Sequence, residues 1–293
     1  RYVLEKLIAR YLPKIVVAPS FAAVLFFVYG FIGWTIWVSM TKSRILPKYD
    51  LVGLIQYDKL WATPRWLVAI ENLGIFIFLF VAIALVVGLF LAILLDQKVR
   101  AEGFIRTTYL YPMALSFIVT GTAWKWILNP GLGIQKVVRD LGFPDFEFGW
   151  LVDPEMALYT IVIAGVWQSS GFVMALFLAG LRSVNQEIIK AAMVDGIGPF
   201  RIYTGIIIPS LRPVFISAII VLVHLAIKSF DLVIALTSGG PGYSTDMPAT
   251  YMYAMAFSRG QLGQASASAT IMLMTVCIFI IPYLYSELRQ KNA

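Results

Sequence analysis

The chain has 293 residues, of which 60% are hydrophobic and 13% are charged, and its formal net charge is +7. Soluble domains carry about 25% charged residues, so this composition excludes an ordinary soluble protein and indicates an integral membrane protein. The positive balance suits anionic lipid headgroups, whereas nucleic-acid binding is disfavoured because no basic stripe lies outside the apolar blocks and their flanks.

Six apolar blocks follow one another along the chain. A bilayer core of about 30 Å needs about 20 apolar residues as a helix. The blocks predict spans at residues 15–40, 72–96, 107–128, 157–181, 214–236 and 265–285. Helices are the expected spanning structure, because no ten-residue pattern of alternating strands appears. We therefore predict an all-α membrane protein with six transmembrane helices, forming a single domain over residues 1–293.

The distribution of lysine and arginine predicts the orientation. With both termini cytoplasmic, thirteen of these residues lie on the cytoplasmic side and eight lie outside, while Lys125 and Lys228 fall within spans. This bias follows the positive-inside rule. Trp34, Trp37 and Trp126 fall near predicted outer ends, where an interfacial belt of aromatic residues is expected. The segment between the fourth and fifth spans is then cytoplasmic.

That segment, residues 183–213, is unusually long and polar, and it includes the stretch NQEIIKAAMVDGIGPFRIYTGIIIPSLRP. Ser183 and Gln186 have the spacing of a capping box, and Gly196 can end the helix that follows in a left-handed conformation. Pro199 can open a second short helix. By helical spacing, one face of the first helix carries Val184, Ile188, Ala191 and Ala192. The alanines leave this face shallow enough for a partner surface, although a helix lying on the lipid is the alternative.

The spacing in this segment resembles the cytoplasmic EAA loop of importer permeases of the ATP-binding-cassette class. The family pattern is Glu-Ala-Ala, three residues, Gly, nine residues and Ile-x-Leu-Pro. The positions that match are Ala191, Ala192, Gly196, Ile206 and Pro209. Ile208 replaces the leucine, and Lys190 replaces the glutamate.

Two further stretches carry the resemblance beyond the loop. LTSGGPGYSTDMPATYMYAMAF, residues 236–257, resembles the outer loop before the last helix of carbohydrate-importer permeases. WKWILNPGLG, residues 124–133, resembles the segment after the third helix in the same group. The resemblance covers nearly the whole chain and is strongest to permeases of glucose/mannose-type importers. It implies the type I importer (MetI-like) fold, in a multi-pass protein of the bacterial plasma (inner) membrane.

The resemblance also implies partners. The EAA loop would form a coupling helix on a separate cytoplasmic ATPase dimer, which would hold ATP and Mg. This chain, which has no G-x-x-x-x-G-K-[ST] phosphate loop, would bind no cofactor and would not itself be an enzyme. A second, related permease forming a heterodimer and an extracytoplasmic sugar-binding protein would complete the assembly in membrane lipid.

The residues expected to serve ATPase coupling are Glu187, Ile188, Lys190, Ala191, Ala192, Asp195, Gly196, Ile206 and Pro209. Since the family's glutamate is expected to meet a basic residue on the ATPase, Lys190 places that ion pair in question. Glu187 lies one helical turn earlier and is a candidate replacement.

Polar residues inside the fourth and fifth spans indicate a path for substrate. On the fifth span, spacings of four, three, four and three place one stripe on a single helix, formed by Ser217, Val221, His224, Lys228 and Asp231. Lys228 and Asp231 can neutralise each other. The fourth span brings WQSSGF, residues 167–172, to a similar depth. The candidate path residues are Trp167, Gln168, Ser169, Phe172, His224, Lys228, Ser229 and Asp231.

Sugars are bound by amide, hydroxyl and charged groups and by aromatic faces, which this set supplies. Alternatives remain for its members. Lys228 and Asp231 can form a structural pair against a partner subunit, His224 can form an interhelical hydrogen bond, and the small residues Gly165, Ser170 and Gly171 can serve helix packing.

The resulting hypothesis is inward transport of a monosaccharide, glucose or mannose. A permease for α-glucosides or other oligosaccharides is the alternative substrate class. A secondary solute transporter is disfavoured, because no repeat with broken helices is visible. A membrane enzyme is also disfavoured, because the chain has one histidine and no metal or catalytic signature stands out.

Overall fold

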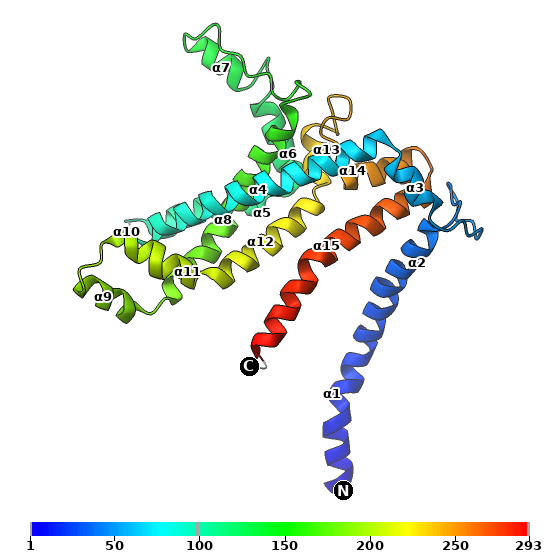
Figure 1. The fold of residues 1–293 in the computed structure, drawn as a ribbon, viewed down its shortest axis with the longest axis horizontal. Coiled ribbons are helices and arrows are strands. Elements are labelled where there is room, and N and C mark those ends of the chain that lie inside the picture. The colour runs from blue at the N-terminus through cyan, green and yellow to red at the C-terminus, as the bar shows by residue number, and fades with distance from the viewer. Residues whose placement is uncertain (1, 98–99, 292–293) are drawn as a thin grey trace. The chain divides into compact units, whose positions relative to one another are not determined.

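The computed structural model describes residues 2–97 and 100–291, and it consists of helices joined by loops (Figure 1). Within those residues, the pairing of extended segments is limited to one isolated bridge between Thr41 and Leu51. The predicted all-α class is therefore confirmed. The chain divides into two compact units, which are described separately. Unit 1 comprises the chain up to Thr63 with Met252–Ile271, and unit 2 comprises Pro64–Tyr251 with the chain from Met272 onward.

Unit 1 begins with one long apolar helical stretch and a loop that folds back on its end. The stretch consists of α1 (Tyr2–Val24), a π turn (Leu25–Tyr29) and α2 (Gly30–Ser39). The loop of residues 40–54 then leads into α3 (Ile55–Trp61), and unit 1 also holds a π turn (Ala254–Ser258) and the start of α15 (Leu262–Lys291). Val52 N donates to Met40 O over 2.8 Å, and Gly263 N donates to Ser43 O over 2.9 Å. These bonds fasten the loop between the end of α2 and the start of α15.

Unit 2 holds most of the helices. In chain order they are α4 (Pro64–Asp96), α5 (Glu102–Ala114), α6 (Phe117–Ile127), α7 (Ile134–Asp140), α8 (Ala157–Ser183), α9 (Gln186–Val194), α10 (Pro199–Ile202), a π turn (Tyr203–Ile207), α11 (Ile208–Ser210), α12 (Arg212–Ile227), α13 (Asp231–Leu236) and α14 (Pro248–Tyr253), which runs on into unit 1. The apolar core lies between α4 and α8, which run side by side (Figure 1). A Cβ at Gly88 would lie 2.5 Å from Val173 Cγ1, so these two helices approach closely at a glycine.

Four of the six predicted spans are single helical stretches long and apolar enough to cross a bilayer. They are Tyr11–Ser39, Pro64–Asp96, Ala157–Ser183 and Leu262–Tyr285, in close agreement with the predicted blocks. A pair of helices, Pro199–Ser210 and Arg212–Ile227, is bent by 63° and would add one more candidate if the pair counts as one span. The predicted third and fifth blocks are not continuous helices.

The third block is interrupted by two residues. Leu115 has ψ 148° and Ser116 has ψ 152°, so the backbone is extended between α5 and α6. Ser116 Oγ accepts a hydrogen bond from Val119 N over 3.3 Å and caps the start of α6. A serine at this position favours a new helix start over continuation.

The fifth block is interrupted at Lys228–Phe230, so the prediction of one continuous polar stripe is wrong. Ser217, Val221 and His224 lie on α12, whereas Asp231 opens α13. Both side chains are exposed, and among the described residues no ion pair joins Lys228 to Asp231. Polar and ionisable groups within a membrane segment usually line a cavity, and irregular backbone is also tolerated there.

The two shorter helices that follow these interruptions, α6 and α13, pack against each other. A Cβ at Gly121 of α6 would lie 2.6 Å from Ala235 Cβ and 3.1 Å from Leu232 O, both on α13. Glycine at this crossing therefore allows the two backbones to approach closely.

Candidate functional site

Both interrupted blocks border one narrow cavity in unit 2. Its walls come from α4, α6, α8 and the junction of α12 with α13, and the lining residues are Phe76, Phe80, Phe117, Gly165, Leu225, Lys228, Ser229, Asp231 and Leu232. The cavity volume is ≈ 20 Å³, which accommodates about one water molecule. In this conformation the cavity cannot hold a sugar ring, so binding there requires its walls to separate.

The polar groups of this cavity come from the α12–α13 junction. Lys228 and Asp231 are exposed side chains on its wall, and Ser229 is 8% exposed. Ser229 Oγ is buried and has no hydrogen-bond partner within the described part of the chain. A cation, a carboxylate and a hydroxyl beside three phenylalanine rings can bind a polyhydroxylated molecule. The sequence predicted the three polar members but not Phe76, Phe80 or Phe117.

The predicted path residues of α8 do not line this cavity. Gln168 is 4% exposed, and its Nε2 donates to Leu115 O over 2.8 Å. That carbonyl lies at the interruption of the third block, so Gln168 supplies a hydrogen bond that a continuous helix would have made internally. Gln168 Oε1 is buried and has no partner among the described residues.

The other predicted path residues lie in different surroundings. Trp167 is 40% exposed, with its ring centroid 5.9 Å from that of Trp124, whereas Ser169 is 3% exposed. Phe172 packs against the apolar core, and His224 is exposed on α12. The structure therefore joins Lys228, Ser229 and Asp231 in one site but does not bring the α8 residues or His224 to it.

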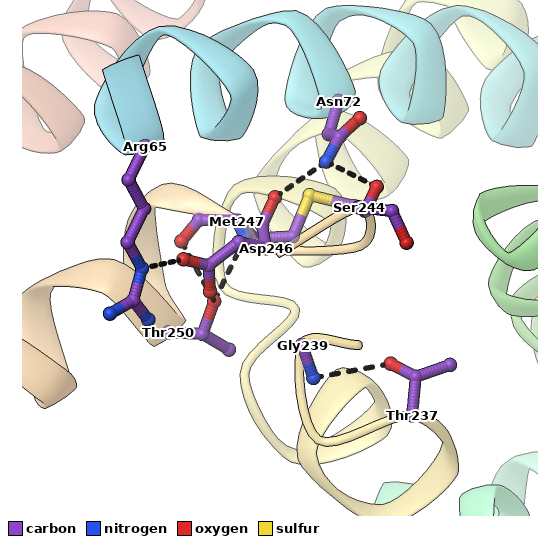
Figure 2. Close-up of polar contacts among 8 residues, drawn as sticks. All are labelled: Arg65, Asn72, Thr237, Gly239, Ser244, Asp246, Met247 and Thr250. Atoms are coloured by element: carbon purple, nitrogen blue, oxygen red, sulfur yellow. Dashed lines mark hydrogen bonds and ion pairs between the residues drawn. The ribbon is translucent and has the colours of Figure 1, made fainter. Parts of the chain in front are cut away.

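A buried polar network fixes the loop before the last helix onto α4 (Figure 2). The carboxylate of Asp246, which is 1% exposed, forms an ion pair with Arg65 of α4. Thr250 Oγ1 donates to Asp246 Oδ1 and accepts a hydrogen bond from Met247 N over 2.8 Å. Asn72 Nδ2 donates to the carbonyls of Ser244 and Asp246 over 2.8 and 2.9 Å. The sequence marked residues 236–257 as a characteristic stretch, but it did not identify Arg65 and Asn72 as the residues that hold it.

The helix α9 lies between the fourth and fifth blocks, and both of its ends are capped. The expected cap at Ser183 is wrong: α8 runs through Ser183, and Asn185 Oδ1 accepts from Glu187 N over 2.9 Å. Asn185 lies nearer the exposed start of α9 and is as strong a capping residue as serine. Gly196 has φ +78°, as predicted, and Ile197 N donates to Ala192 O over 3.0 Å, which is the Schellman pattern. Pro199 opens α10, also as predicted.

The two alanines of α9 differ in burial. Ala191 is exposed, whereas Ala192 is 5% exposed and belongs to the apolar core of unit 2. The expected shallow face formed by both alanines is therefore corrected to Ala191 alone. Of the other predicted coupling residues, Ile206 is half-buried and the rest are exposed, namely Glu187, Ile188, Lys190, Asp195, Gly196 and Pro209.

Large apolar side chains are exposed next to Ala191. Met193 is 60%, Val194 87% and Phe200 80% exposed, all within the short segment formed by α9 and α10. Apolar side chains gathered on a polar connecting segment mark a surface suited to a protein partner.

Comparisons with known proteins agree with this organisation. The family described as "Binding-protein-dependent transport system inner membrane component" matches residues 84–291. The chain is 42% identical over 269 residues to a probable ABC transporter permease protein of Pyrococcus horikoshii, covering 91% of this chain and 92% of that protein. It is 38% identical over 267 residues to the xylose/arabinose import permease protein XacH of Haloferax volcanii, covering 90% of this chain and 84% of that protein. These relatives are transport components rather than enzymes.

A solved structure has the same fold. A chain of a bacterial ABC transporter involved in the import of the acidic polysaccharide alginate superposes with a TM-score of 0.80. The match covers 99% of this chain and 98% of that chain at 20% sequence identity. The predicted importer-permease fold is thereby confirmed.

Proposed function

Because this chain belongs to the binding-protein-dependent transport system inner membrane component family, we propose that it is the permease subunit of an ATP-driven sugar importer. The observation that carries the proposal is the α9–α10 segment, which combines the EAA-loop spacing with an exposed apolar surface. A sugar is favoured because relatives are named for xylose/arabinose and for trehalose/maltose. Within this class, the sequence resemblance favours glucose or mannose, and pentoses or disaccharides are the competing substrates.

We further propose a topology of six spans with both termini cytoplasmic, in the bacterial plasma membrane. The third span would be α5 with α6 and the fifth would be α12 with α13, each interrupted beside the cavity. The positive-inside bias supports this orientation. The partners would be a second permease, an ATPase dimer that holds ATP and Mg, and an extracytoplasmic sugar-binding protein.

A bulky side chain at Ala191 tests the coupling surface. Ala191 is exposed on α9, so Ala191→Trp should leave the chain's own packing intact while holding the ATPase surface away. We expect sugar uptake and sugar-stimulated ATP hydrolysis to fall together by about tenfold, which corresponds to about 1.4 kcal/mol of lost interaction. The measurement is uptake of labelled sugar by the reconstituted complex with its binding protein, alongside release of phosphate.

Ala192→Trp is the matched comparison, because Ala192 lies in the core of unit 2. This variant should lower the amount of folded protein, whereas Ala191→Trp should not. Normal uptake by a well-inserted Ala191→Trp complex would show that this surface of α9 does not couple to the ATPase. Sugar uptake driven by a proton or sodium gradient, without ATP, would instead favour a secondary transporter.

Removal of the polar groups at the cavity tests the substrate path. Lys228 and Asp231 supply the charges of the cavity. Lys228→Ala and Asp231→Ala should therefore each raise the sugar concentration for half-maximal uptake by about tenfold. This factor corresponds to the loss of one charged hydrogen bond of about 1.5 kcal/mol. Uptake of labelled glucose, mannose, xylose and maltose measures both this effect and the sugar class.

Gln168→Ala separates a structural role from substrate contact. Since Gln168 bonds Leu115 O, its loss should lower thermal stability with little change in sugar preference. If Lys228→Ala and Asp231→Ala leave uptake kinetics unchanged, this cavity is not on the substrate path. Competition by maltose but not by glucose would reject the monosaccharide.

A further inference from the structure

A pocket in unit 1 carries a strong positive charge. It has a volume of ≈ 500 Å³ and lies where the loop of residues 40–54 and α3 meet the start of α15. Its wall includes Lys42, Arg44, Lys48, Lys59, Gln56 and Gln264. None of the residues lining this pocket is acidic.

The described residues provide no ion-pair partner for the four cations. None of them takes part in an ion pair within the part of the chain that the structure describes. Like charges around one pocket repel one another and raise the local potential, so an anion that entered would relieve this repulsion. The pocket is therefore suited to an anionic ligand.

Hydrogen bonds of buried side chains hold part of the pocket wall in place. Ser43 and Gln56 are 3% and 7% exposed, and Gln56 Nε2 donates to Thr41 O over 2.7 Å. Ser43 Oγ accepts from Lys48 N over 3.0 Å and so fixes the turn that carries Lys48. Lys42 and Lys48 therefore extend from a backbone held in place by buried polar contacts, and only their flexible ends need to be ordered by a ligand.

Exposed apolar side chains accompany these charges on the same loop. Each is at least 64% exposed, and they are Ile45, Leu46, Tyr49, Leu51 and Leu54. The candidate spans Tyr11–Ser39 and Leu262–Tyr285 both have one end at the pocket, and Trp34 and Trp37 lie just before that end of the first span. Tryptophan residues near span ends mark the bilayer interface. If these two helices span the bilayer as proposed above, the pocket would lie at the depth of the lipid headgroups.

We propose that this pocket binds the phosphate of an anionic phospholipid, with the apolar side chains of residues 45–54 in the adjoining acyl boundary. Basic and apolar side chains on one interfacial segment are the combination that binds anionic membrane surfaces. Free phosphate would satisfy the charges but not the apolar residues. An acidic protein surface would have to reach a pocket already at headgroup depth.

The test uses the full chain, purified with the subunits that assemble with it, and counts retained phospholipids by native mass spectrometry. We expect retention of phosphatidylglycerol but not of phosphatidylcholine. Lys42→Gln/Lys48→Gln should weaken this retention by about tenfold or more, since each cation near an anionic surface contributes about 1 kcal/mol. Lys48→Arg should retain the lipid. Lys125→Gln/Lys136→Gln removes the same charge from residues that do not line the pocket and should have no effect.

Competitors identify the source of the anion. Inorganic phosphate, added at the lipid concentration, should leave phosphatidylglycerol bound, and equal binding of phosphate alone would overturn the lipid assignment. Unchanged lipid retention by Lys42→Gln/Lys48→Gln, or equal retention of phosphatidylcholine, would also overturn it. If the double variant keeps its lipid but binds the sugar-binding protein more weakly, the pocket is a protein-docking surface instead.

Discussion

Asp246→Ala should destabilise the purified protein by about 3 to 5 kcal/mol, as expected when one partner of a buried ion pair is removed. The carboxylate of Asp246 is 1% exposed, and it contacts both Arg65 and Thr250. Alanine would leave the guanidinium of Arg65 largely buried without its counter-charge. The midpoint of thermal unfolding, followed by differential scanning fluorimetry in detergent, measures the change.

Two other variants make this prediction specific. Thr250→Val removes the hydrogen bond to Asp246 and the one accepted from Met247 N, and it should destabilise by about 2 kcal/mol, less than the loss of the carboxylate. Asp145→Ala removes an exposed carboxylate and should leave the unfolding midpoint within error of the unsubstituted protein. If Asp246→Ala behaves like Asp145→Ala, the network of Figure 2 does not contribute to stability.

Gly171→Ala should separate α5 from α8 and destabilise the protein by about 3 kcal/mol, at the upper end of the usual range for overpacking. A Cβ at this position would lie 1.9 Å from Tyr109 O and 2.7 Å from Tyr109 C. Because both atoms belong to the backbone of α5, rotation of a side chain cannot relieve the overlap. Thermal unfolding and the yield of folded protein both report this change.

Gly74→Ala provides the control for helix propensity. Gly74 lies in α4, and a Cβ there meets nothing within 4 Å. The exchange should stabilise the helix by up to about 1 kcal/mol, since alanine is the better helix former. An unfolding midpoint for Gly171→Ala that equals or exceeds that of Gly74→Ala would show that the two helices are not in backbone contact.

The sequence predicted much of the helical framework because apolar length alone determines where a span can lie. The block at 157–181 matches α8 closely. Gly196 follows the end of α9 with a positive φ and Pro199 begins α10, as the backbone preferences of these residues require. The interruption at Leu115 was missed because it leaves the apolar block unbroken. The available signal was Ser116, a capping residue placed directly before the apolar run of α6.

The cavity was predicted only in part, for a related reason. Lys228, Ser229 and Asp231 stand out because ionisable and hydroxyl groups are unusual inside an apolar block. Phe76 and Phe80 could not be recognised, because their position at the cavity depends on how α4 packs against other helices. Gln168 was recognised as unusual, but its bond to Leu115 O could not be foreseen without the interruption of the third block.

The interruptions at residues 115–116 and 228–230 also have a mechanical consequence. A continuous helix bends sharply only where its regular backbone hydrogen bonds are interrupted, and both junctions are such places. Leu115 N and Ser229 N donate to carbonyls three residues back, and Phe230 N donates to a carbonyl two residues back, instead of four. Phe117 and Asp231, the first residues of α6 and α13, both lie on the cavity wall. The two helices pack closely against each other at Gly121. If α6 and α13 turn together about these junctions, the width of the cavity would change while every helix stays intact.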